Sequence, residues 1–165
     1  MRQKLISAAA MWCILLAATA FGQEPSVLSP TEAARIVPAG FYFEGQSAPT
    51  QMRNSAVARL GKNRHVIAGL VDTSGYSSSI VEKYIGFLIT DSSIVIGGKE
   101  LGTGAYGFGF TADGKMNILD IGGKTILTVS ANRDEALKRP RPLIMVKSPE
   151  GIRLYNGKTY VTVNL

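Results

Sequence analysis

The stretch SIVIGGKELGTGAYGFGFTADGKMNILDIGGKTILTV, residues 93–129, decides the fold class. Short apolar runs alternate in it with turn signals in which a glycine directly precedes a lysine. These signals are Gly97-Gly98-Lys99, Asp113-Gly114-Lys115 and Gly122-Gly123-Lys124, and Asn156-Gly157-Lys158 repeats the pattern near the C-terminus. Each places glycine where a primed turn needs a positive φ angle. The pattern predicts consecutive β-hairpins and hence an all-β antiparallel fold, either a β-sandwich or a small, partly open barrel.

Strands are also predicted on both sides of this stretch. Residues 56–60 and 65–71 flank Gly61-Lys62-Asn63-Arg64, which predicts a hairpin. The second of these strands is apolar on both faces, as is typical of a central strand that is covered on each side. Apolar residues at alternate positions from Val81 to Ile89, interrupted by Lys83, predict the next strand. Further strands are predicted over residues 41–43, 143–147, 152–155 and 159–165.

The segment Gly102–Gly107 matches the letters G-x-G-x-x-G of dinucleotide-binding loops. That fingerprint works only where a helix follows, because the helix N-terminus holds the pyrophosphate. Here Tyr106, Phe108 and Phe110 alternate with small residues, which is the period of a strand. We therefore interpret the segment as a strand with one aromatic face and one nearly bare face. A bare face predicts either close packing of another backbone or a ligand cleft.

A short helix is predicted before the β domain. Ser29 suits the N-cap, Pro30 the first helical position and Glu32 the capping box. The helix, residues 31–36, must end before Pro38, because proline disfavours a helical residue in front of it.

The N-terminus has the three parts of a secretory signal peptide. Basic residues in Met1–Lys4 precede a mostly apolar core, Leu5–Leu16, and Ala18-Thr19-Ala20 is an A-x-A cleavage site, with a second site at Ala20-Phe21-Gly22. An uncleaved membrane anchor is the alternative, but a spanning helix needs about 20 apolar residues. The predicted organisation is a signal peptide (1–20), an N-terminal segment with the short helix (21–39) and one antiparallel β domain (40–165).

Removal of residues 1–20 changes the composition of the chain. The 165 residues include 18 basic and 12 acidic ones; without the two basic residues of the signal, 16 face 12, a net charge of +4. This charge is too small for the concentrated basic face of a nucleic-acid-binding protein. The only cysteine, Cys13, and the only tryptophan, Trp12, are also removed, so no disulfide is predicted. No later apolar run is long enough to span a membrane, and we expect a periplasmic or extracellular protein.

Few residues are suited to catalysis. His65 is the only histidine, so a Ser–His–Asp triad would have to use it, and no G-x-S-x-G motif is present. With one histidine and no cysteine after processing, neither a metal site nor a cofactor is predicted. A pair of carboxylates for glycoside hydrolysis stays open, with the candidates Glu44, Asp72, Glu82 and Asp120.

One long, charged loop, residues 132–142, interrupts the hairpins. In it Arg139 and Arg141 stand on either side of Pro140, and alternating arginine and proline favour an extended chain that projects both guanidinium groups. Such groups suit phosphate or carboxylate, so Arg139 and Arg141 are the predicted ligand-binding residues. The alternative is a solvated surface loop.

Residues 93–107, SIVIGGKELGTGAYG, resemble a strand–GGK–L–x–x–G–x–Y–strand segment of uncharacterised exported bacterial domains of all-β type. That family often has proline after the leucine, where this chain has Gly102. The resemblance covers about 15 of the 165 residues. It implies an exported all-β domain and assigns no catalytic residue.

These observations predict an exported, non-enzymatic binding or interaction module. Its partner would be an anionic envelope polymer or another envelope protein, and neither nucleic acid nor a membrane span is expected. Two alternatives stay open: a hydrolase that acts on an envelope or extracellular polymer, and a structural envelope subunit that pairs through a strand edge.

Overall fold

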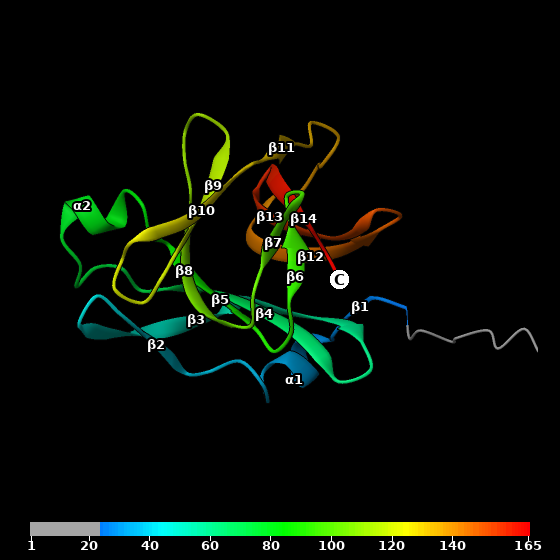
Figure 1. Cartoon of the computed structure of the whole chain (residues 1–165), viewed down its shortest axis with the longest axis horizontal. Coiled ribbons are helices and arrows are strands. Elements are labelled where there is room, and N and C mark those ends of the chain that lie inside the picture. The colour runs from blue at the N-terminus through cyan, green and yellow to red at the C-terminus, as the bar shows by residue number, and fades with distance from the viewer. Residues whose placement is uncertain (1–23) are drawn as a thin grey trace, which may run out of the picture.

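The computed structural model describes residues 24–165. The predicted signal peptide, with Trp12 and Cys13, therefore lies outside the described residues. Within them, two antiparallel sheets pack face to face and do not close into a barrel (Figure 1). The all-β prediction is confirmed, and of its two architectures the structure has the sandwich. No helix among these residues is long and apolar enough to cross a bilayer.

The first sheet is the larger one and contains most of the N-terminal two thirds of the chain. Its strands follow the order β1 (Ser26–Val27), β3 (Gln46–Gly61), β4 (Arg64–Val71), β5 (Gly86–Thr90), β8 (Gly104–Phe110), β9 (Lys115–Leu119) and β10 (Thr125–Ser130), with β2 (Gly40–Phe43) paired to β3. The hairpin predicted around Lys62 joins β3 to β4, and Asn63 takes a positive φ of 56° in its turn.

The second sheet combines the C-terminal strands with one hairpin from the middle of the chain. Its order is β12 (Arg141–Ser148), β13 (Gly151–Gly157), β14 (Thr159–Asn164), β6 (Ile94–Ile96) and β7 (Lys99–Leu101), with β11 (Asn132–Arg133) paired to β14. The β6–β7 hairpin leaves the first sheet after β5, and the chain returns to it at β8. The chain therefore crosses from the first sheet to the second and back again within residues 90–104.

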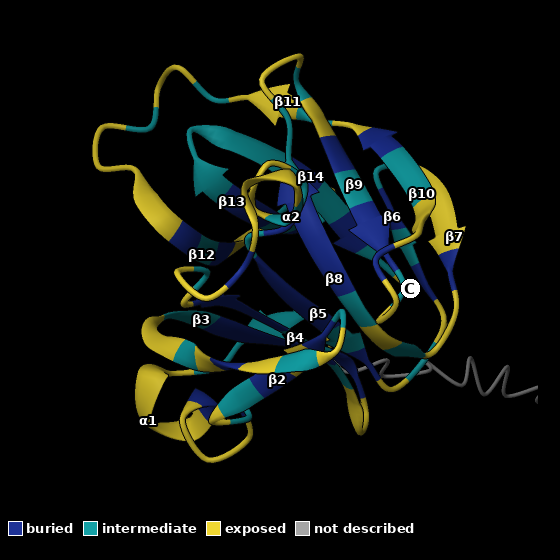
Figure 2. Cartoon of the chain, turned by 90° about the vertical axis from the view of Figure 1, so that its left-hand side faces the viewer, coloured by how far each residue is buried: buried dark blue, intermediate teal, exposed yellow. Residues whose placement is uncertain are grey.

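The first sheet is covered on both faces, as the sequence of β4 predicts. Val66, Ala68 and Leu70 face the core between the two sheets. Ile67 and Val71, which point the other way, belong to a second core beneath β2, α1 (Pro30–Ala33) and the segment 72–85. Buried segments accordingly lie on either side of this sheet (Figure 2). The prediction of a central, doubly covered strand is confirmed.

The bare face of β8 is closed by an aromatic ring. Phe108, flanked by Tyr106 and Phe110, faces the core between the sheets. On the opposite face, a Cβ added at Gly107 would stand 2.5 Å from the ring of Phe43. Of the two readings of this face, close packing is the one that the structure shows.

The turn glycines have the positive φ angles that the sequence predicts, but only one turn has the full geometry of a primed turn. Gly98, Gly114, Gly123 and Gly157 all have positive φ angles, between 62° and 81°. Among these four turns only Gly97-Gly98 has two successive positive values, 54° and 80°, as a type I′ turn requires.

The N-terminal helix α1 has the predicted capping box. The Ser29 side chain accepts from the Glu32 amide, and the Glu32 carboxylate accepts from the Ser29 amide at 3.0 Å. The helix itself is one turn long. The Val37 amide donates to the Ala33 carbonyl at 2.9 Å, so helix-like turns continue as far as Pro38.

The strand predicted over residues 81–89 is wrong in its first half. Val81 ends a short helix, α2 (Ser78–Val81), and β5 begins only at Gly86. Val81 and Ile85 are four residues apart, a spacing that fits one face of a helix as well as alternate positions of a strand. Phe87 and Leu88 are adjacent and both fully buried, because β5 lies between the two cores.

Candidate functional site

The two long sides of the sandwich differ. On one side the edge strands β7 and β10 are bridged, because the Lys99 ammonium donates to the Thr128 carbonyl at 2.8 Å. On the other side β12 packs against β3 (Figure 2) and lies close to β1, but no ladder joins it to either strand. The outer edge of β12 therefore has no backbone hydrogen-bond partner among residues 24–165.

A groove of about 260 Å³ lies on this side of the sandwich. Its apolar surface comes from α1, from the chain just before it and from β12. Pro30, Ala33 and Ala34 contribute from α1, with small side chains that leave room. Three successive residues of β12 line it, from Leu143 to Met145. The groove is large enough for several water molecules or for a short alkyl chain.

A bulge in β3 supplies the other wall. The register between β3 and β4 shifts between Thr50 and Ser55, so residues 51–54 bulge out of the ladder. Two local bonds hold the bulge: the Asn54 amide donates to Gln51 Oε1 at 2.8 Å, and the Ser55 hydroxyl donates to the Met52 carbonyl at 2.7 Å. Met52 and Arg53 thereby reach the groove.

Two arginines and no acidic residue line the groove. Arg53 comes from the β3 bulge and Arg141 from the first residue of β12. Both are exposed, and neither takes part in an ion pair within residues 24–165. The groove thus joins an apolar floor to two cations whose charge is not balanced locally.

The two predicted ligand-binding arginines lie in different surroundings. Arg141 lines the groove, whereas Arg139 lies in the exposed loop before β12 and does not line it. That loop is tied to the second sheet by Asp134, which accepts a bond from the Tyr155 hydroxyl at 2.9 Å. Arg53 was not anticipated from the sequence; its only signal is the mostly polar run 51–55 ahead of the apolar residues 56–60.

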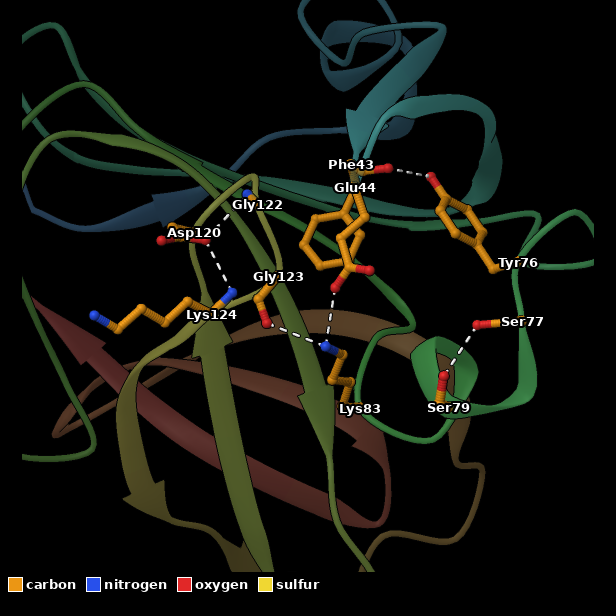
Figure 3. Close-up of polar contacts among 10 residues, drawn as sticks. All are labelled: Phe43, Glu44, Tyr76, Ser77, Ser79, Lys83, Asp120, Gly122, Gly123 and Lys124. Atoms are coloured by element: carbon orange, nitrogen blue, oxygen red, sulfur yellow. Dashed lines mark hydrogen bonds and ion pairs between the residues drawn. The ribbon is translucent and has the colours of Figure 1, made fainter.

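A second polar cluster joins three turns on the far side of the first sheet (Figure 3). The Lys83 ammonium lies 2.9 Å from Glu44 Oε1 and donates to the Gly123 carbonyl at 3.2 Å. Nearby, the Tyr76 hydroxyl lies within bonding distance of the carbonyls of Phe43 (3.3 Å) and Gln46 (3.2 Å). These contacts fasten the β2–β3 turn to the segment around α2 and to the β9–β10 turn. The cluster is structural, and the sequence reasoning missed Tyr76.

Three of the four candidate acids of a hydrolase have local partners. Glu44 pairs with Lys83, Asp72 accepts from the Ser74 amide at 3.0 Å, and Asp120 accepts from the Gly122 and Lys124 amides. The Ser74 bond lowers the pKa of Asp72. Glu82 is exposed at the end of α2. None of the four lines the groove.

His65 pairs with a neighbouring strand end. Its Nδ1 lies 3.2 Å from Asp91 Oδ2, and its amide donates to Asp91 Oδ1 at 2.8 Å. No group of three or more metal-ligating side chains is found among residues 24–165.

Family models, curated proteins and solved structures were compared with the chain, and none matches it. The resemblance of residues 93–107 to exported all-β domains therefore stays a prediction.

Proposed function

We propose that this chain is an exported, non-enzymatic binding module whose ligand carries an acidic group and an apolar part. The observation that carries the proposal is the groove along β12, which is lined by apolar side chains and by Arg53 and Arg141, without a carboxylate. Apolar pockets with a few convergent polar groups are the usual form of a ligand site.

The two kinds of lining have separate tasks. The apolar floor favours a ligand by removing hydrocarbon from water, at roughly 25 cal/mol per Å². The guanidinium groups select an anion, because a planar fork of donors matches a carboxylate or a phosphate. A charge-assisted bond contributes about 1.5–3 kcal/mol, which is roughly a tenfold to hundredfold gain in affinity.

Binding is favoured over hydrolysis because the groove holds no group suited to proton transfer. No histidine, aspartate or glutamate lines it, and three of the four candidate carboxylates, Glu44, Asp72 and Asp120, have local partners elsewhere. The partner we propose is an anionic envelope polymer or an envelope protein with an acidic apolar segment.

Export rests on the N-terminal sequence and has its own test. Because Trp12 is the only tryptophan, protein purified after export should show tyrosine emission alone. Tryptophan emission from that material would mean that the signal peptide is retained.

The groove can be tested with three small probes and protein that was produced from the full-length sequence and purified after export. Octanoate combines an alkyl chain with a carboxylate, 1-octanol keeps the chain, and acetate keeps the charge. We expect octanoate to bind more tightly than either, measured from amide chemical shifts of residues 141–145. Equal affinity for octanol and octanoate would contradict the role of the arginines.

The chain offers a matched control for the arginines. Arg141→Ala and Arg53→Ala should each weaken octanoate binding by tenfold or more, since each removes a charge-assisted bond. Arg139→Ala removes the same charge two residues from Arg141 but outside the groove, and should leave the affinity unchanged. An equal loss in all three variants would indicate a general charge effect and would overturn the site.

A further inference from the structure

We infer that the occupant of this groove is the C-terminal end of a partner polypeptide, which adds as an antiparallel strand to the edge of β12. Its terminal carboxylate would lie between Arg53 and Arg141. The inference rests on the proposed function and narrows it to one class of ligand.

The first argument is the state of the β12 edge. Within residues 24–165, β12 pairs with β13 alone and ends its sheet. The turn at Pro149-Glu150 makes Ser148 and Gly151 the closing pair of the hairpin. Because antiparallel pairs alternate between bonded and non-bonded, the backbone groups of Met145 and Lys147 point away from β13. These groups are the ones that an added strand needs.

The second argument is how the groove meets the strand. Successive residues of a strand point to opposite faces, so a pocket lying on one face contacts only every second residue. Leu143, Ile144 and Met145 are consecutive, and all three line the groove. The groove therefore reaches the strand along its edge.

The composition of this edge gives the third argument. Leu143 to Val146 are four consecutive apolar residues, and Val146 is 39% exposed. Natural proteins usually protect such an edge with charges or proline, because it invites pairing with another chain. Here Pro142 and Lys147 flank the run and leave its centre open. An edge of this kind is suited to strand addition.

Charge sets the direction of the added strand. Arg141 begins β12, and Arg53 lines the same groove. An antiparallel strand ends where β12 begins, so its carboxylate meets the two guanidinium groups. A parallel strand would bring its amino end there instead, and like charges would oppose it. The far end of β12 is occupied by the ion pair of Lys147 with Glu24 (2.5 Å).

The register between the added strand and β12 also determines which side chains of the ligand face the core. Residues directly opposite each other in a ladder point to the same face. With the terminal residue opposite Leu143, the third residue from the end lies opposite Met145. Leu143 and Met145 point into the core. Apolar side chains are therefore expected at the last and third-last positions of the ligand.

Three labelled peptides test the inference on the exported protein. The first is Thr-Ser-Leu-Ser-Val with a free carboxylate, the second its C-terminal amide, and the third Thr-Leu-Ser-Val-Ser, which keeps the composition and shifts the apolar positions by one. We expect the first to bind at least tenfold more tightly than the other two by fluorescence anisotropy. Arg141→Ala should remove the preference for the acid, and Arg139→Ala should keep it.

Amide exchange separates strand addition from simple filling of the groove. The first peptide should slow the exchange of the Met145 amide, followed by NMR, whereas octanoate should not. Binding without this protection, or equal binding of acid and amide, would overturn the inference. Protection of Met145 before any peptide is added, in a protein with the mass of a dimer, would overturn it in favour of self-pairing.

The two proposals fail in different ways. If octanoate binds through Arg141 but no peptide does, the groove is a site for a small acid, and only the inference falls. If neither binds, both fall. Arg141→Ala and Arg53→Ala alter exposed side chains, and an unchanged melting midpoint would show that any lost binding is not lost folding.

Discussion

Gly107 and Phe43 are in such close contact that a Cβ on the glycine would stand 2.5 Å from Cε2 of the ring. The ring stacks in turn on Tyr84, with centroids 3.8 Å apart and planes inclined by 12°. Both aromatic residues are fully buried. The bare face of β8 thus lets the β2–β3 hairpin and the segment after α2 pack directly on the first sheet.

Alanine at position 107 should therefore destabilise the protein by roughly 1–3 kcal/mol, the usual cost of overpacking a core. Gly102→Ala is the control, because the nearest atom to its added Cβ is the Tyr106 hydroxyl at 4.0 Å. Urea unfolding of both variants measures the difference. A Gly107→Ala variant as stable as Gly102→Ala would mean that the ring does not lie against β8.

Valine at position 157 should destabilise for a different reason. Gly157 has a φ of 62°, and nothing lies within 4 Å of a Cβ placed there, so the cost is conformational and not steric crowding. A β-branched residue at positive φ is strained, and we expect a loss of more than about 1 kcal/mol. Gly157→Asn should lose less, because asparagine tolerates this conformation. An unchanged melting midpoint for Gly157→Val would contradict the positive φ.

The parts of the fold that were predictable are those set by local chemistry. Interactions within a few residues determine the turn glycines and the capping box at Ser29. The burial of β4 on both sides follows from the apolar residues on both of its faces. The first half of residues 81–89 was not predictable, because Val81 and Ile85 fit a helix and a strand equally. What decides between them is Tyr84, which packs on a ring 41 positions away in the sequence.

The candidate site was half predictable for the same reason. Arg141 was predicted as a ligand-binding residue from the charged loop and lines the groove, whereas Arg139 of the same loop lies outside it. Arg53 belongs to the groove only because a bulge displaces residues 51–54 out of the ladder, and because β12 of the second sheet packs against β3 of the first. Neither the size of a bulge nor the pairing of distant edges is encoded in local spacing.

The capping box makes part of the stability depend on pH. The Ser29 hydroxyl, and then the Ser29 amide, hold the pKa of Glu32 below its ordinary value of 4.5. A carboxyl whose pKa is lowered by folding adds stability above its unfolded pKa and loses it as the pH falls through the folded one. Wild type should therefore exceed Glu32→Gln in unfolding free energy at pH 6, and the difference should shrink as the pH falls below 4.5 and the carboxylate becomes protonated. A constant difference between them would contradict the capping role of the carboxylate.

The last prediction concerns Tyr84 and Tyr76, whose rings meet edge to face with centroids 5.4 Å apart. The Tyr84 hydroxyl is buried and has no hydrogen-bond partner among the described residues, whereas the Tyr76 hydroxyl lies 3.2 Å from the Gln46 carbonyl. An unpartnered buried hydroxyl costs free energy, and a bonded one contributes about 0.5–1.5 kcal/mol. At pH 7, Tyr84→Phe should thus equal or exceed wild type in stability, while Tyr76→Phe should fall below it.

Alkaline pH provides an independent measurement of the same hydroxyl. Burial raises the pKa of Tyr84 above its ordinary value of 10. The unfolded chain therefore releases this proton first as the pH rises past 10, and the folded state loses stability relative to it. Tyr84→Phe has no such proton, so its advantage over wild type should widen between pH 10 and pH 11 in urea unfolding. If Tyr84→Phe instead costs as much as Tyr76→Phe at pH 7 and the gap does not widen, the Tyr84 hydroxyl has a partner and its burial is not the source of the shift.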